Sequence, residues 1–96
     1  MKTKSNVIKF YGIEYDIIYK DKENDDNMGR VEYKKAIIEI DSTMKEDVQK
    51  MVLMHECTHI ILAHLGETDL NNNESFVERL SNAIFRLMKD NKEVLL

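Results

Sequence analysis

Hydrophobic and polar residues follow two different periods along this chain, and the period changes near Asp41. Between residues 13 and 20, Ile and Tyr at every second position alternate with mostly polar residues. A period of two with these residue types predicts a strand that is buried on one face. Residues 7–10 lead into this strand, with Gly12 as a bend or bulge, and residues 30–33 and 36–40 predict two more strands. Short joins between consecutive strands favour an antiparallel three-stranded sheet.

The second half of the chain follows the period of an α-helix. Thr43 and Glu46 have the spacing of a capping box, which predicts a helix over residues 44–65 that stops at Gly66. Apolar residues occur on nearly every side of this helix, so we expect it to lie between the sheet and a second helix. That second helix is predicted over residues 73–89, with the preceding run of Asn residues as loop and cap. The expected fold class is α+β.

Composition narrows the classes of protein that fit this pattern. The 96 residues are enough for one domain, expected to span the whole chain. Fourteen Lys and Arg against eighteen Asp and Glu give a net charge of −4, which argues against direct nucleic-acid binding. One cysteine excludes an internal disulfide framework, and no apolar run approaches the roughly 20 residues that span a bilayer. We therefore expect a cytoplasmic protein without a membrane partner, and the pattern leaves its oligomeric state open.

The strongest chemical signal is an H-E-x-x-H motif on the first predicted helix, His55-Glu56-Cys57-Thr58-His59. Residues four apart lie on the same helical face, so the two imidazoles can converge on one metal ion. The intervening Glu56 projects about 100° away from His55 and can act as a general base without being a ligand. Zinc suits such a site, because it polarises a carbonyl and lowers the pKa of a water toward about 7.

A catalytic zinc site needs a third protein ligand. His64 lies on the opposite side of the helix from His55, and we interpret it as a helix-end residue. Cys57 also points away from the histidine pair and is interpreted as structural. The remaining candidates are Glu74 and Glu78, which are one turn apart on the second predicted helix. Helical-wheel geometry favours Glu74, because it lies nearer the apolar stripe of that helix.

The motif and the second helix together resemble a known arrangement. H-E-x-x-H followed on the next helix by E-x-x-[SA]-[DN] is the gluzincin pattern, and the chain contains Glu78-Arg79-Leu80-Ser81-Asn82 there. Over most of its length the chain resembles the small ImmA/IrrE-type metallopeptidase domains of phages and other bacterial mobile elements. The resemblance implies a minimal zincin-like fold, with a three-stranded antiparallel sheet packed on an active-site helix and a third-ligand helix.

The same resemblance implies the roles of individual residues. His55, His59 and Glu78 would be zinc ligands, and Glu56 would be the catalytic base. The protein would be a zinc-dependent endopeptidase that cleaves a specific intracellular protein, such as a repressor-type regulator encoded by the same element. The substrate would pair with the sheet edge at residues 36–40.

Two questions remain open at this stage. No motif assigns an oxyanion-stabilising residue, for which Tyr33 and His64 are the candidates. The second candidate function is a zinc-containing, non-catalytic protein-binding module. Glu56 distinguishes the two functions, because a purely structural zinc site has no need of an unligated carboxylate.

Overall fold

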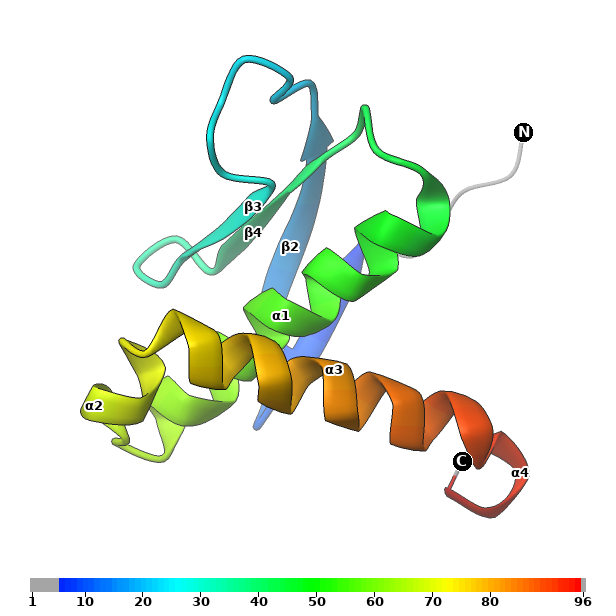
Figure 1. The fold of residues 1–96 in the computed structure, drawn as a ribbon. Coiled ribbons are helices and arrows are strands. Elements are labelled where there is room, and N and C mark those ends of the chain that lie inside the picture. Colours follow the sequence, from blue (N-terminus) through cyan, green and yellow to red (C-terminus); the bar gives the residue numbers. More distant parts are fainter. Residues whose placement is uncertain (1–5, 96) are drawn as a thin grey trace.

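The computed structural model describes residues 6–95 (Figure 1). The fold is α+β, with one four-stranded mixed sheet and four helices within those residues. In chain order the elements are β1 (Val7–Phe10), β2 (Ile13–Lys20), β3 (Gly29–Glu32), β4 (Ile37–Asp41), α1 (Glu46–His64), α2 (Thr68–Asn71), α3 (Glu74–Asp90) and α4 (Lys92–Leu95).

The sheet differs from the predicted three-stranded antiparallel arrangement, which is wrong in two respects. Residues 7–10 form a strand of their own, paired with β2 across a two-residue turn at Tyr11 and Gly12. Both turn residues have positive φ, 52° and 81°, as a type I′ hairpin requires. The strand order is β1-β2-β4-β3, in which β4 pairs with β2 in parallel and with β3 in antiparallel.

The loop between β2 and β3 explains the second error. Residues 21–28 carry the chain past the position beside β2, so the hairpin that follows places β4, not β3, next to β2. A strand paired on both sides is central, and residues 38–41 are all buried. The expectation that residues 36–40 offer a free sheet edge is therefore wrong. The edge at this end of the sheet is β3.

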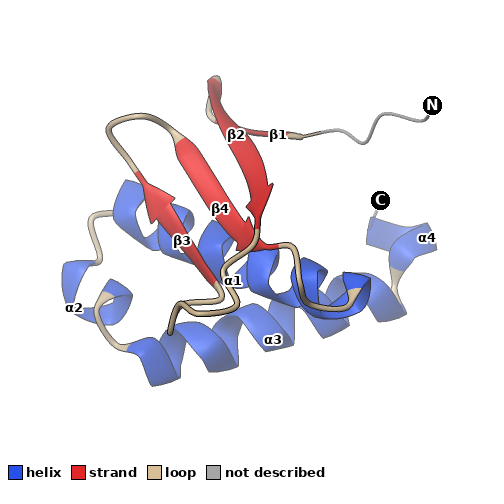
Figure 2. Cartoon of the chain, turned by 90° about the horizontal axis from the view of Figure 1, so that it is seen from above, coloured by secondary structure: helices blue, strands red, loops and turns tan. Residues whose placement is uncertain are grey.

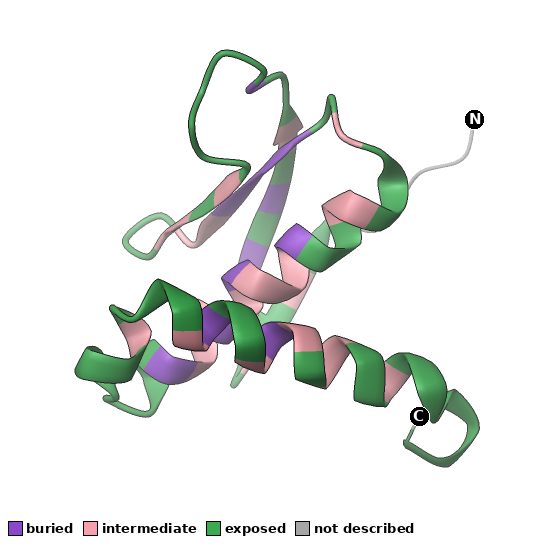
Figure 3. Ribbon diagram, viewed as in Figure 1, coloured by how far each residue is buried: buried purple, intermediate pink, exposed green. Residues whose placement is uncertain are grey.

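The core forms between one face of the sheet and α1. Ile38 and Ile40 of β4 are fully buried and join Tyr15 and Ile17 of β2 in one cluster with residues of α1. On its other flank, α1 packs along α3, where Val77 is fully buried (Figure 2). The prediction that the motif helix lies between the sheet and another helix is confirmed. Burial concentrates in β2, β4 and α1, whereas much of the C-terminal part of α3 is exposed (Figure 3).

The predicted capping box at the start of α1 does not form. Lys45 is the N-cap, and no side chain caps the helix. The Thr43 hydroxyl instead donates to Asp41 Oδ1 at 2.7 Å, and the same oxygen accepts the Thr43 N–H at 3.0 Å. Asp41 therefore stabilises the turn that precedes α1, and the helix begins at Glu46 rather than at residue 44.

The other helix boundaries lie close to the predicted ones. At the C-terminal end of α1, Gly66 has a φ of 75°, the left-handed conformation expected after a helix. Asn73 caps α3, because its side chain accepts a hydrogen bond from the Phe76 N–H at 3.0 Å. The short helix α2 was not predicted, and its last residue, Asn71, belongs to the run of Asn residues interpreted as loop and cap. Among residues 6–95, no helix combines the length and apolar character needed to cross a membrane.

Candidate metal centre

The two histidines of the motif lie side by side on α1. The centroids of the His55 and His59 rings are 5.0 Å apart, and their side chains are 18% and 15% exposed. The one-turn spacing produces this arrangement, because side chains at i and i+4 lie on the same helical face. Both rings can therefore contact the same side chain of α3.

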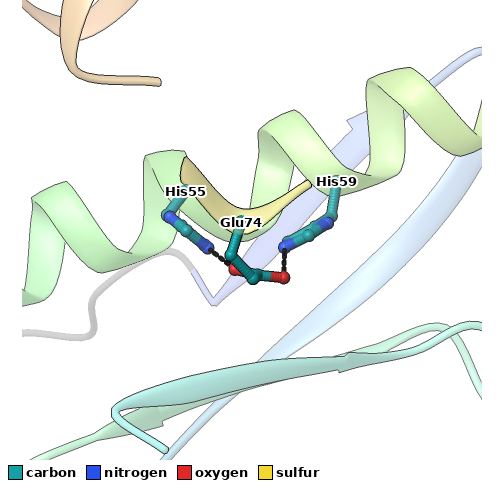
Figure 4. Close-up of side chains that lie close together, drawn as sticks. All are labelled: His55, His59 and Glu74. Carbon is teal, nitrogen blue, oxygen red and sulfur yellow. Dashed lines mark hydrogen bonds and ion pairs between the residues drawn. The ribbon is translucent and has the colours of Figure 1, made fainter. Parts of the chain in front are cut away.

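The first residue of α3 provides a carboxylate that bridges the two rings. Glu74 Oε1 lies 3.1 Å from Nε2 of His55, and Glu74 Oε2 lies 3.2 Å from Nε2 of His59 (Figure 4). One ligand atom from each of these residues can be chosen so that all three lie within 4.8 Å of one another. The Nε2 atoms thus face a common point beside a carboxylate.

The Nδ1 atoms of the same rings are also hydrogen bonded. His55 Nδ1 lies 2.9 Å from Glu78 Oε1, and His59 Nδ1 lies 2.5 Å from Asn71 Oδ1. Histidines that bind metals commonly donate their other ring N–H to an oxygen of this kind, which fixes the ring orientation and the tautomer. Two separate elements, α2 and α3, hold the rings so that each Nε2 is directed to the common point.

The structure separates the two candidates for the third ligand by the ring atom that each contacts. Glu74, which the helical wheel favoured, lies at the Nε2 atoms of both histidines. Glu78, which the family resemblance implies, lies at Nδ1 of His55, and its other oxygen is 3.5 Å from the Asn82 amide. Asn71 was not expected to contribute, because the segment that contains it was interpreted as a loop.

Glu56 lies on the sheet side of the histidine pair, between α1 and β3. It is 6% exposed, and burial raises the pKa of its carboxyl although the two neighbouring histidines lower it. Gly29 of β3 allows this close approach of strand and helix. A Cβ atom at Gly29 would lie 3.4 Å from Glu56 Oε2 and 2.8 Å from Val52 Cγ1.

These side chains line a groove of about 540 Å³ between β3 and the helices. The lining combines polar and apolar side chains. The polar ones include Asp26, Asn27, His55, Glu56, His59, Glu74 and Glu78, and the apolar ones include Met28, Val48, Met51 and Val52. Concave sites of this size with a few convergent polar groups are the usual form of ligand sites.

The remaining candidates lie in three different environments. His64 packs against the β1–β2 turn, with its ring centroid 4.2 Å from that of Tyr11, and it is not among the residues that line the groove. Tyr33 does line the groove, and its hydroxyl donates to the His59 carbonyl at 3.4 Å. Burial raises the pKa of Cys57 to about 11, so its thiol stays protonated at neutral pH, in keeping with a structural role.

Two imidazole nitrogens and a carboxylate are a donor set that zinc accepts, and other divalent transition metals accept it as well. The residues present therefore fit a metal ion. No protein-family model, curated protein or solved structure matches this chain. The assignment as a candidate metal site therefore rests on its three donor groups, on the hydrogen bonds to the Nδ1 atoms of both histidines, and on the groove in which these groups lie.

Proposed function

We propose that this protein is a zinc-dependent endopeptidase that hydrolyses a peptide bond in a specific intracellular protein. One observation carries the proposal: both motif histidines direct Nε2 to a point beside an α3 carboxylate, in a groove that also contains Glu56. A zinc ion held there would polarise the peptide carbonyl and lower the pKa of the attacking water.

The protein side chains would bind the metal, orient its ligands and transfer the proton. His55 and His59 would hold the metal, while Asn71 and an α3 carboxylate would keep their rings in the productive orientation. Glu56 would accept a proton from the attacking water and then donate it to the leaving amine, the ordinary cycle of a general base. Its burial against Gly29 keeps it beside the reacting groups.

Either of two carboxylates would complete the metal site. Glu74 is supported by its distances to both Nε2 atoms. Glu78 is supported by the resemblance of its helix to the third-ligand helix of gluzincins, and its Oε1 is already in contact with His55. The two assignments differ in which substitution removes the metal.

The family resemblance also supports a narrower substrate and place of action. Members of the ImmA/IrrE type cleave repressor-type regulators encoded by the same mobile element. We extend this to the present chain as a cytoplasmic activity on such a regulator.

A non-catalytic, zinc-containing binding module is the second candidate function. It is favoured by the presence of two carboxylates beside the two histidines, since four protein ligands would close the coordination shell as in structural zinc sites. In that case Glu56 would have no chemical role.

The experiment that tests the metal site is a measurement of zinc content after reconstitution and removal of excess metal. We expect about one zinc per wild-type chain, as one His2Glu site would hold. His55→Ala should lose the zinc, and so should one of Glu74→Gln and Glu78→Gln. Glu14→Gln, an exposed substitution on β2, serves as the matched control.

Circular dichroism of each variant would confirm that the fold is retained. Loss of zinc in Glu74→Gln alone identifies Glu74 as the third ligand, and loss in Glu78→Gln alone identifies Glu78. The proposal is overturned if the wild type takes up no zinc, or if His55→Ala binds zinc as well as the wild type does.

A further inference from the structure

The two histidines of the candidate metal centre are held at Nδ1 by different kinds of side chain. His55 Nδ1 lies 2.9 Å from Glu78 Oε1, and an ionised carboxylate can only accept, so this contact fixes the place of the ring proton. His59 Nδ1 faces an amide instead, the Oδ1 atom of Asn71. A half-turn of that amide about its last bond would present an NH2 donor where the structure has an acceptor.

The orientation of the Asn71 amide decides whether His59 can bind a metal at Nε2. With Oδ1 towards the imidazole, Nδ1 carries the proton and the Nε2 lone pair is available to a metal ion. With the NH2 group towards the imidazole, Nδ1 must accept, and a neutral imidazole then carries its proton on Nε2. A protonated nitrogen is not a metal ligand. His59 therefore needs an amide that is held in one of its two orientations.

The helix that carries Asn71 does not make this distinction. α2 is about one turn long, and none of its residues is buried. The Asn71 N–H donates to the Glu67 carbonyl at 2.9 Å, which places the backbone but treats both orientations of the side-chain amide alike. A partner from another element must select between them.

Tyr33 is such a partner. It lies in the turn between β3 and β4, at the same end of α1 as α2 (Figures 1 and 2). Burial raises the pKa of Tyr33, and a side-chain hydrogen bond with Asn71 opposes this increase. A hydrogen bond that favours the phenolate comes from a donor to the hydroxyl oxygen, and the only donor in the Asn71 side chain is its NH2 group.

The contacts of Tyr33 and Asn71 form a closed loop of hydrogen bonds around His59. The Tyr33 hydroxyl accepts from the Asn71 amide and donates to the His59 carbonyl, 3.4 Å away. Asn71 Oδ1 in turn accepts from Nδ1 of the same histidine. Because the NH2 group of Asn71 is engaged by Tyr33, the amide oxygen is the atom that faces the imidazole.

We propose that Tyr33 is a positioning residue of the metal centre, which holds the Asn71 amide in the orientation that makes Nε2 of His59 available to the ion. The inference rests on the metal site of the proposed function and adds a residue to it. It gives Tyr33 a role other than stabilising an oxyanion, because the hydroxyl proton is directed to a main-chain carbonyl of α1.

The first test compares the zinc affinities of two hydroxyl deletions by competition with a chromogenic chelator. Tyr33→Phe should bind zinc about ten-fold more weakly than wild type, as expected when an outer hydrogen bond of a metal site is removed. Tyr11→Phe is the matched control, because Tyr11 is 75% exposed and is not among the groove-lining residues. Its affinity should equal that of wild type. Circular dichroism of both variants would confirm that the fold is retained.

A substitution of Asn71 shows whether Tyr33 acts through it. In Asn71→Asp the orienting group is a carboxylate with an acceptor on both sides, so there is no wrong orientation to exclude. Adding Tyr33→Phe to this variant should therefore lower the zinc affinity by less than about two-fold, against about ten-fold in the wild-type background. A ten-fold loss in both backgrounds would overturn the proposal, since Tyr33 would then act independently of Asn71.

Cleavage assays at saturating zinc separate this inference from the proposed function. We expect the kcat of Tyr33→Phe to stay near that of wild type. Weaker zinc binding by this variant, without any cleavage by wild type, supports the role of Tyr33 and overturns the peptidase. Unchanged zinc affinity overturns the inference and leaves the zinc site in place, and a lower kcat in that case assigns the hydroxyl to the substrate. A wild type that takes up no zinc overturns both.

Discussion

Two clusters of charged side chains lie on opposite faces of the sheet region, and they differ in how their charges are balanced. The first, which we call the sheet cluster, consists of Glu39, Arg30, Lys20 and Lys22. Glu39 Oε1 lies 2.9 Å from Arg30 Nε and 3.3 Å from Lys22 Nζ, and its other oxygen lies 3.4 Å from Lys20 Nζ. Asp25 also pairs with Lys22 at 3.0 Å and Glu32 with Arg30 at 3.5 Å, so three carboxylates balance the three cations. Arg30 is the main reason that the pKa of Glu39 falls to about 2.

The candidate metal centre lacks this balance. Glu74 and Glu78 contact two imidazoles, which carry charge only when protonated, and the carboxyl of Glu56 is buried next to them. Acidic groups exceed permanent cations in this set of residues. A cluster whose charges balance within the chain stabilises the fold, whereas a cluster with surplus carboxylates is suited to an external cation.

The largest effect is expected from Glu56→Gln, at the candidate metal centre. Because Glu56 is the proposed general base, this substitution should lower the rate of the proposed peptide cleavage by about 10³-fold. Zinc content and thermal stability should stay near those of the wild type, because the amide is isosteric with the acid. Cleavage assays paired with metal analysis provide the measurement. Full cleavage by this variant would contradict the assignment of Glu56 as the general base, whereas absence of cleavage by the zinc-loaded wild type would favour the binding-module function.

A second substitution tests the strand that separates the two clusters. A Cβ at Gly29 would lie 2.9 Å from the Glu39 carbonyl oxygen on one side and 3.4 Å from Glu56 Oε2 on the other. Gly29→Ala should therefore lower the free energy of unfolding by about 2–3 kcal/mol through overpacking. Urea denaturation gives the value.

The matched control is Gly66→Ala, where nothing lies within 4 Å of an added Cβ and only the positive φ of 75° opposes the change. Its cost should be about 1 kcal/mol. Equal costs for the two variants would show that β3 can move away from α1 at little expense.

The sheet cluster itself is tested by pH. Because the pKa of Glu39 in the folded protein is about 2, below its ordinary value of 4.5, its ionisation stabilises the fold above pH 4.5. That contribution is lost as the pH falls from 4.5 towards 2. Glu39→Gln should cost on the order of 1–2 kcal/mol at pH 7 and flatten the loss of stability in this pH window.

Urea denaturation of both proteins at a series of pH values measures the effect. Glu14→Gln, whose carboxylate forms an exposed pair with Lys9, should follow the wild-type curve. A Glu39→Gln variant with the same acid profile as wild type would contradict a stabilising role for the sheet cluster.

The two long helices and the histidine pair could be predicted from the sequence because their signals are local. The cap at Asn73 and the stop near Gly66 each involve residues within a few positions of one another. The strand order could not be read in this way, since alternation reveals which face of a strand is buried and not which strand lies beside it. The capping box failed because Asp41, a residue outside the motif, bonds the Thr43 hydroxyl instead.

The metal ligands could be predicted from the sequence only in part, for a similar reason. Residues four apart on one helix must share a face, so the convergence of His55 and His59 follows from spacing alone. Which edge of each ring meets Glu74, Glu78 or Asn71 depends on how α2 and α3 pack on α1. That packing involves residues of three helices that lie far apart in the sequence.

The free edge of β3 also affects the behaviour of the protein at high concentration. Unpaired strand edges can join those of other copies and lead to aggregation, a hazard that natural sheets limit with short strands and charged residues. β3 has only four residues, and two of them are Arg30 and Glu32. Lys34 and Lys35 follow in the turn to β4. The short length and the charged side chains of β3 should therefore limit pairing between the β3 edges of two copies of the protein.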